Sequence, residues 1–298
     1  MPHTKVSFVR YGMWLGETLA YRRFRAHHTE INDLYWSLAP VAGYCDRLAG
    51  KTQETKPEAL FHASGPDVHR LAPSIERWRS DFEEFQNWVR LAALMSASAY
   101  FEMFLIELLT LAMRSDPLSR FGSPRLLDGV TWLKQGAGGV PDDEIRACTV
   151  GEWSKRRKAM KALLGKTPAD IENNMAELDR IRRLRNKVGH AFGRSIERKP
   201  SLLKIGTPDS ERLSEKRFKA WLGLIDAIAG GLDREVGGTH VGEFETLLYY
   251  HEWRHEPRVR AQADGLEAVL FAKALRARFG GGPDRTFCRD LIAHYNAC

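Results

Sequence analysis

Cysteine is scarce in this chain of 298 residues, and its four cysteines are far apart: Cys45, Cys148, Cys288 and Cys298. They form neither a Cys-x-x-Cys pair nor the dense pattern of a small disulfide-rich secreted domain. The sequence therefore predicts free thiols in a cytoplasmic protein. Nothing in the pattern indicates a cofactor, and we expect none.

Long uninterrupted apolar runs are also missing. The longest apolar stretch, "LAALMSASAYFEMFLIELLTLAM", contains Glu102 and Glu107, whereas a bilayer span needs about 20 mostly apolar residues. We therefore interpret this stretch as a core helix and expect no membrane partner. The first residues also lack the charged, apolar and small segments of a signal peptide, in that order.

Alternating strand patterns are rare, and helical spacing prevails along most of the chain. We expect one short strand near Val6–Val9 and little regular structure in residues 120–144, which are rich in Gly and Pro. The predicted fold class is all-α: a helical bundle over residues 75–235. An N-terminal extension, 1–74, and a C-terminal helical extension, 236–298, flank it.

Three helices of this bundle can be predicted from their sequence patterns. A long helix is predicted from about Pro73 to Met113, with an apolar side formed by Phe82, Phe85, Val89, Ala92, Met95 and Ala99. A basic helix at 151–164 should end at Gly165, and the next should begin at Pro168 behind a Thr167 cap. The helix that begins at Pro168 is predicted to carry on its inward side Ile171, Met175, Leu178, Ile181, Leu184 and Val188.

Positive charge is concentrated in one segment. The whole chain carries a net charge of +7. Residues 151–199 hold fourteen Lys and Arg against six Asp and Glu, a local charge of +8. Such a field can attract a polyanion. The alternative is a helical hairpin whose Lys and Arg simply face solvent.

Within this segment, "RNKVGH" places Arg185 and His190 five residues apart near a helix end. Five residues advance about 140° around an α-helix and about 7.5 Å along it. Histidine can act as base or acid near neutral pH, and arginine offers a charged fork matched to phosphate oxygens. The spacing alone is permissive, because Arg22 and His27 share it. A solvated helix end is the alternative interpretation.

The later motif has a more specific context. Asn186 follows Arg185, and an early long helix contains "SASAYFEMFLIELL" at 96–109. In these features, across about residues 75–235, the chain resembles the HEPN family of helical-bundle ribonucleases. The resemblance implies a homodimer that places two Arg–His motifs in one cleft. It also implies metal-independent cleavage of RNA by 2′-hydroxyl attack, in a toxin or antiviral defence effector.

By this resemblance, Arg185 would bind the scissile phosphate and His190 would be the acid or base. Asn186 would orient one of them or hold a phosphate oxygen, and Glu102 is a candidate acidic partner. Neighbouring cations are candidates for RNA binding: Arg182, Arg183, Lys187 and Arg194. An antitoxin or defence partner is conceivable, but Phe192 stands where some HEPN toxins carry the tyrosine that an antitoxin modifies.

Two other functions remain open. The chain could be a non-catalytic RNA-binding or regulatory subunit of a defence complex, which needs only the basic field. It could also be a zinc hydrolase, because His251, Glu252 and His255 fit the H-E-x-x-H pattern. In that pattern the two histidines would bind Zn²⁺ and Glu252 would be the base. Glu267 is the best-placed third ligand, while Arg254 and Pro257 disfavour the site.

Overall fold

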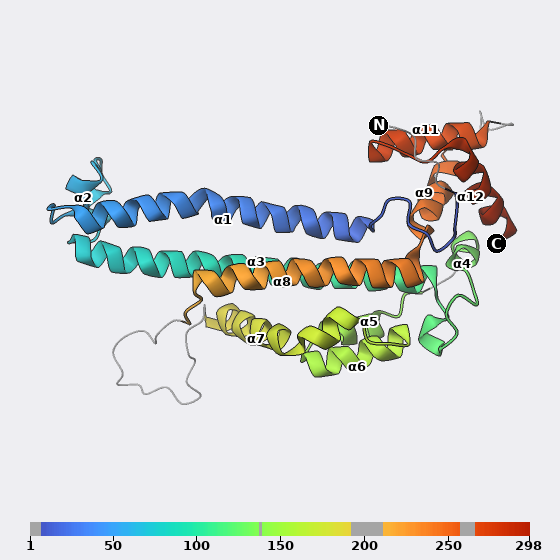
Figure 1. The fold of residues 1–298 in the computed structure, drawn as a ribbon, viewed down its shortest axis with the longest axis horizontal. Coiled ribbons are helices and arrows are strands. Elements are labelled where there is room, and N and C mark those ends of the chain that lie inside the picture. The colour runs from blue at the N-terminus through green and yellow to red at the C-terminus, as the bar shows by residue number, and fades with distance from the viewer. Residues whose placement is uncertain (1–6, 137–138, 192–210, 257–265) are drawn as a thin grey trace. The chain divides into compact units, whose positions relative to one another are not determined.

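The computed structural model describes residues 7–136, 139–191, 211–256 and 266–298, without the side chain of Ala191. In these ranges every regular element is helical (Figure 1), which confirms the all-α class. The strand expected near Val6–Val9 is wrong as far as it is described, because residues 7–9 are irregular.

The described residues form α-helices along most of their length. These helices are α1 (Leu19–Lys51), α2 (Pro57–Leu60), α3 (Ile75–Ser115), α4 (Gly129–Lys134), α5 (Asp142–Thr149), α6 (Trp153–Leu164), α7 (Ala169–Ala191), α8 (Glu215–Leu232), α9 (Phe244–Arg254), α11 (Glu267–Phe279) and α12 (Arg285–Ala297). The described residues also form three short helices: η1 (Val68–Arg70), η2 (Ser119–Phe121) and the π-helical η3 (Asp233–Val241).

The chain forms two compact units, each built from separate stretches of sequence. Unit 1 comprises Met1–Phe24, Glu102–Met175 and Ala227–Cys298; unit 2 comprises Arg25–Phe101 and Ala176–Asp226. The long helices α1, α3, α7 and α8 contribute residues to both. This division differs from the three consecutive segments expected from the sequence, which stay a prediction.

Unit 2 is a bundle of parts of α1, α3, α7 and α8. Its core consists of side chains at helical spacing from all four: Ile31, Tyr35, Leu91, Leu94, Ala97, Leu178, Ile181, Leu184, Val188, Phe218, Leu222 and Ile225, each at most 9% exposed. The Tyr35 and Phe218 rings pack with their centroids 4.7 Å apart. The expected inward side of α7 is therefore confirmed at the residues named here.

The apolar side expected for α3 is partly wrong. Phe85 is 44% exposed and Ala99 is exposed, whereas Leu91 and Leu94 are 1% exposed. The aromatic residues instead stack along the helix flank, Trp78 on Phe82 and Phe82 on Phe85. By length and composition alone α3 could cross a membrane, and 44% of its most apolar window is buried inside the structure.

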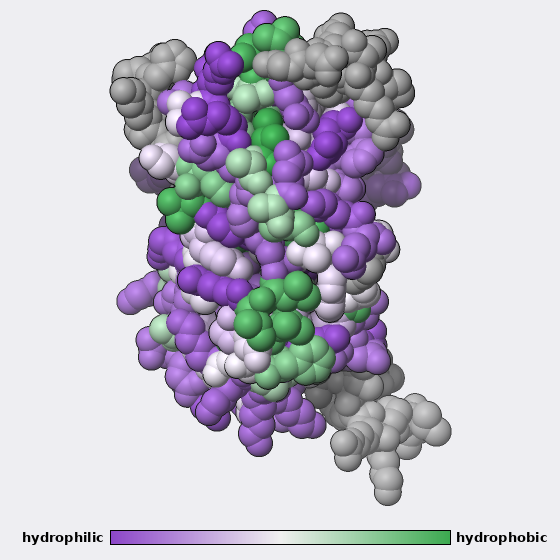
Figure 2. Space-filling model, turned by 90° about the vertical axis from the view of Figure 1, so that its right-hand side faces the viewer, coloured by the Kyte–Doolittle hydropathy of each residue, from purple (hydrophilic) through white to green (hydrophobic). Residues whose placement is uncertain are grey.

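Unit 1 holds α4, α5, α6, α9, α11, α12, η2 and η3, whereas α2 and η1 belong to unit 2. Here α5 packs on α6, α11 on α12 and α4 on α9, and Figure 1 shows α5 and α6 lying together. The view of Figure 2, from the side on which α4 and α12 lie in Figure 1, shows apolar patches separated by hydrophilic side chains.

The segment 120–144 is more regular than expected. It contains η2 and α4, and α5 begins at Asp142. The Asp128 carboxylate accepts a hydrogen bond from the Val130 N–H at 3.0 Å and so caps α4. Gly129 lies against the end of α3, where a Cβ would be 1.8 Å from the Arg114 carbonyl oxygen. The pair Asp128-Gly129, whose residue types suggest a loop, therefore begins helix α4.

Candidate nucleic-acid interface

The exposed side of α7 carries a basic stripe, formed by Arg180, Arg183, Lys187 and His190. These four side chains are all exposed. They are spaced by three, four and three residues, so they lie along one face of the helix. The buried residues of α7 point elsewhere, which leaves the stripe to solvent.

The stripe borders a groove of about 410 Å³ within unit 2. Its lining comprises five cationic side chains, two carboxylates and two apolar residues: Arg180, Arg183, Lys187, Arg212, Arg217, Glu177, Glu211, Leu184 and Trp221. The lining residues therefore carry an excess of positive charge. A groove of this kind suits an anionic chain better than an apolar ligand.

Several cations in the groove are balanced by carboxylates. Lys187 pairs with Glu211, Arg180 with Glu177, and Arg212 with Glu84. Among the described residues no ion pair engages Arg183. Exposed pairs of this type contribute about 0–1 kcal/mol each, so a phosphate can exchange with the carboxylate partner at small cost.

The Trp221 ring supports the groove rather than stacking a base. Its indole N–H donates to Glu177 Oε2 at 2.9 Å, and the residue is only 6% exposed. The Arg217 guanidinium lies 5.9 Å from the ring centroid. Because base stacking needs an exposed ring face, the groove offers phosphate contacts and no aromatic platform at Trp221.

The wall opposite α7 is held by polar side chains of α3. Asn87, 2% exposed, donates to the Glu211 carbonyl and accepts from the Leu213 N–H, both at 2.9 Å. Arg90 donates to the Leu213 carbonyl oxygen at 2.6 Å. These contacts fix the backbone on either side of Arg212.

The structure brings together some of the residues expected from the sequence. Arg183 and Lys187 line the groove, and His190 lies one turn beyond Lys187 on the basic stripe. Arg185 is half-buried, faces another side of α7, and donates to Asn186 Oδ1 at 3.4 Å. Arg182 pairs with Asp179 at 3.0 Å. Arg194 and Phe192 lie outside the described residues.

Glu102, the expected acidic partner, belongs to unit 1, whereas Arg185 and His190 belong to unit 2. Its carboxylate accepts a hydrogen bond from Arg156 Nη2 at 3.0 Å. The Arg156 side chain is 4% exposed. Glu102 therefore has a structural task, the neutralisation of a buried guanidinium.

Some residues that form or support the groove were not predicted from the sequence, because they lie outside the segment around Arg185 and His190. Arg212 and Arg217 lie in "ERLSEKRFK", residues 211–219, whose positive charges could have been noticed. Asn87 and Arg90 lie more than 120 residues from their hydrogen-bond partners. No pattern in the sequence connects positions so far apart.

The H-E-x-x-H segment of α9 is engaged in packing. His251 Nδ1 is 2.6 Å from the Tyr295 hydroxyl, and His255 Nδ1 is 2.6 Å from the His251 carbonyl oxygen. Burial lowers the pKa of His251. The expected third ligand, Glu267, accepts a hydrogen bond from the Tyr250 hydroxyl at 2.5 Å. These contacts engage one ring nitrogen of each histidine and one carboxylate oxygen of Glu267.

Comparisons of this chain with protein-family models, with curated proteins and with solved structures find no match. The likeness to HEPN ribonucleases therefore rests on the motif and its helical context.

Proposed function

We propose that the chain is a metal-independent endoribonuclease that acts as a homodimer. The observation that supports this function best is the basic stripe of α7, which ends in the exposed imidazole of His190 and borders a groove with five cationic side chains. The stripe would hold the phosphates of an RNA strand and lead it to His190. A role in toxin or antiviral systems rests on the resemblance alone.

The proposed reaction is transesterification. A base removes the 2′-hydroxyl proton, the O2′–P bond forms, and the P–O5′ bond breaks as an acid protonates the leaving 5′-oxygen. The products are a 2′,3′-cyclic phosphate and a 5′-hydroxyl. Histidine can supply both proton transfers, but each needs its own group in the right protonation state.

One chain does not supply the complete set of groups. It carries a single motif histidine, and the five-residue spacing turns Arg185 about 140° away from His190 around α7. A second copy, packed with its α7 end against the first, would supply the second histidine. The guanidinium groups of Arg185 would then stabilise the charge on the phosphate.

The test is RNA cleavage in the presence of a chelator. Purified full-length protein should produce fragments with cyclic phosphate and 5′-hydroxyl ends, while DNA and 2′-O-methyl RNA resist. His190→Ala should lower the cleavage rate at least about 100-fold, as expected for losing a general acid or base. His255→Ala, another exposed histidine, is the matched control and should cleave normally. Cleavage that requires Mg²⁺ or Zn²⁺, or that survives in His190→Ala, contradicts the proposal.

RNA binding without cleavage is the second candidate, favoured by the position of Arg185 outside the groove. In this case neither wild type nor His190→Ala cleaves RNA, and both bind it with affinity that falls steeply with salt. Arg183→Glu should weaken binding in either case, because it reverses the charge of a groove cation that has no carboxylate partner among the described residues. Its control is Arg289→Glu on α12, an exposed arginine paired with the adjacent Asp290.

A further inference from the structure

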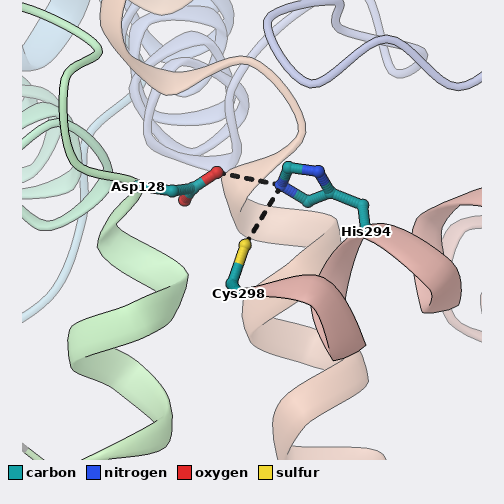
Figure 3. A group of neighbouring side chains, drawn as sticks. All are labelled: Asp128, His294 and Cys298. Atoms are coloured by element: carbon teal, nitrogen blue, oxygen red, sulfur yellow. Dashed lines mark hydrogen bonds and ion pairs between the residues drawn. The ribbon is translucent and has the colours of Figure 1, made fainter.

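Three potential metal ligands converge in unit 1. They are Asp128, which precedes α4, and His294 and Cys298 at the end of α12 (Figure 3). His294 and Cys298 are four residues apart, a spacing that places two side chains on one helix face. In the described part of the chain, this is the one group of three or more such residues whose ligand atoms lie within 4.8 Å of one another.

The distances in this group resemble those of a tetrahedral zinc site. His294 Nε2 is 3.6 Å from Cys298 Sγ and 2.9 Å from Asp128 Oδ2. With ordinary zinc bond lengths, a tetrahedral ion separates its nitrogen and sulfur ligands by about 3.6 Å and its nitrogen and oxygen ligands by about 3.4 Å. A shift of roughly half an ångström in the carboxylate would therefore admit the ion.

The carboxylate is oriented by surrounding donors. Arg10 donates to Asp128 Oδ2 from Nε at 2.6 Å and to Oδ1 from Nη2 at 2.9 Å. Arg10 is itself held by the Val241 carbonyl and the Ser115 hydroxyl. Partners of this kind fix the geometry of metal ligands and their loss weakens binding.

We propose that Asp128, His294 and Cys298 bind a zinc ion that joins α4 to α12. Zinc suits one nitrogen, one sulfur and one carboxylate oxygen better than the hard cations that prefer oxygen alone. Binding converts the Cys298 thiol to a thiolate and releases its proton to solvent, while neutral His294 gives its Nε2 lone pair to the ion. The two anionic ligands balance the charge of Zn²⁺. The remaining fourth position is open to water.

The proposal does not depend on the function assigned to α7. The zinc ligands belong to unit 1, and Arg185 and His190 belong to unit 2. We assign the ion no step in RNA cleavage. The test below uses metal binding and thermal stability as readouts, so its failure is separate from a failure to cleave RNA.

The experiment starts from full-length protein that has been stripped with chelator and dialysed. Titration with Co²⁺, a spectroscopic substitute for zinc, should produce a sulfur-to-cobalt charge-transfer band that saturates at one ion per chain. Zn²⁺ should remove this band by displacing Co²⁺, and should raise the thermal midpoint. Such a band arises only when a thiolate binds the metal ion. A hydrogen bond between Cys298 and His294 does not produce it.

Cys298→Ser should lose the charge-transfer band and bind Zn²⁺ at least about 100-fold more weakly. Cys45→Ser is the matched control, since Cys45 is also a half-buried free cysteine but lies in α1 of unit 2. His294→Ala should weaken binding as well and tests a second ligand without altering a thiol. A band that persists in Cys298→Ser, or a wild-type titration with Co²⁺ that gives no saturating charge-transfer band, overturns the proposal.

Discussion

At the scale of single residues, Glu102 illustrates how one carboxylate can suit two roles. Its residue type and helix make it a candidate site acid, whereas its contact with the buried Arg156 makes it part of the packing. Arg156 also donates to the Gly151 carbonyl at 2.9 Å and lies over the Trp153 ring. Removing the carboxylate would leave this guanidinium buried beside a neutral partner.

We therefore expect Glu102→Gln to lower the free energy of unfolding by about 3 kcal/mol, the lower end of the range for a broken buried pair. Under the proposed function, the RNA cleavage rate per folded molecule should stay close to that of wild type. Urea denaturation and cleavage assays check the two values. Glu144→Gln, which breaks the exposed pair with Arg120, is the control and should cost less than about 1 kcal/mol. Lost cleavage at unchanged stability would restore Glu102 as a site residue.

At the scale of helices, the sequence predicts those elements whose signals are local. The stop at Gly165 is confirmed, because this residue has φ +79° at the end of α6. The buried side predicted for α7 is confirmed. The prediction succeeds because the apolar residues of this helix repeat at helical spacing. The side chosen for α3 is partly wrong because that helix is apolar around much of its circumference, so the pattern does not select one face.

Gly165 offers a direct measurement of a helix stop. A Cβ at this position would meet no atom within 4 Å, so substitution costs only the strain of a left-handed backbone. Gly165→Ala should lower the free energy of unfolding by roughly 1–2 kcal/mol. Gly223→Ala in α8 is the matched control, since it also meets nothing within 4 Å but has ordinary helical backbone. It should stabilise by about 0.5–1 kcal/mol. Equal effects in urea denaturation would contradict the interpretation.

At the scale of the whole molecule, the sequence predicts the helical class but not the partnership of distant segments. Arg10 and Asp128 are 118 residues apart, and the buried pair of His240 and Asp116 spans 124. Such pairs depend on tertiary folding, which spacing does not encode. The same limit explains why the sequence does not place Arg212 and Arg217 beside the basic residues of α7, although their charges can be read from it.

Long-range contacts of this type make the stability of the protein depend on pH. Glu243, 2% exposed, accepts hydrogen bonds from the Trp14 N–H at 2.7 Å and the Thr246 hydroxyl at 2.9 Å. Burial raises its pKa to about 7. Burial likewise raises the pKa of Glu245 to about 7, and this carboxylate accepts from the Leu19 N–H at 3.0 Å. Both groups tie the N-terminal segment to α9.

The sign of the effect follows from proton binding. An unfolded glutamate loses its proton near pH 4.5, whereas folded Glu243 keeps it until about pH 7. Between these values the folded state binds more protons, so the free energy of unfolding falls as pH rises. The contribution of Glu243 is fully present below about pH 4.5 and lost above about pH 7, on the order of 3 kcal/mol.

Glu243→Gln should therefore flatten the decline in stability between pH 5 and 7, because a neutral amide of similar shape has no proton to lose. Urea denaturation of wild type and variant at each pH gives the difference between the two curves. In that difference the contributions of the other titrating groups to the free energy of unfolding cancel. One of these groups is His251, whose lowered pKa makes stability rise with pH. Glu256→Gln, at an exposed position following α9, is the control and should reproduce the wild-type slope. Parallel curves for wild type and Glu243→Gln would show that Glu243 is already ionised in the folded protein at pH 5.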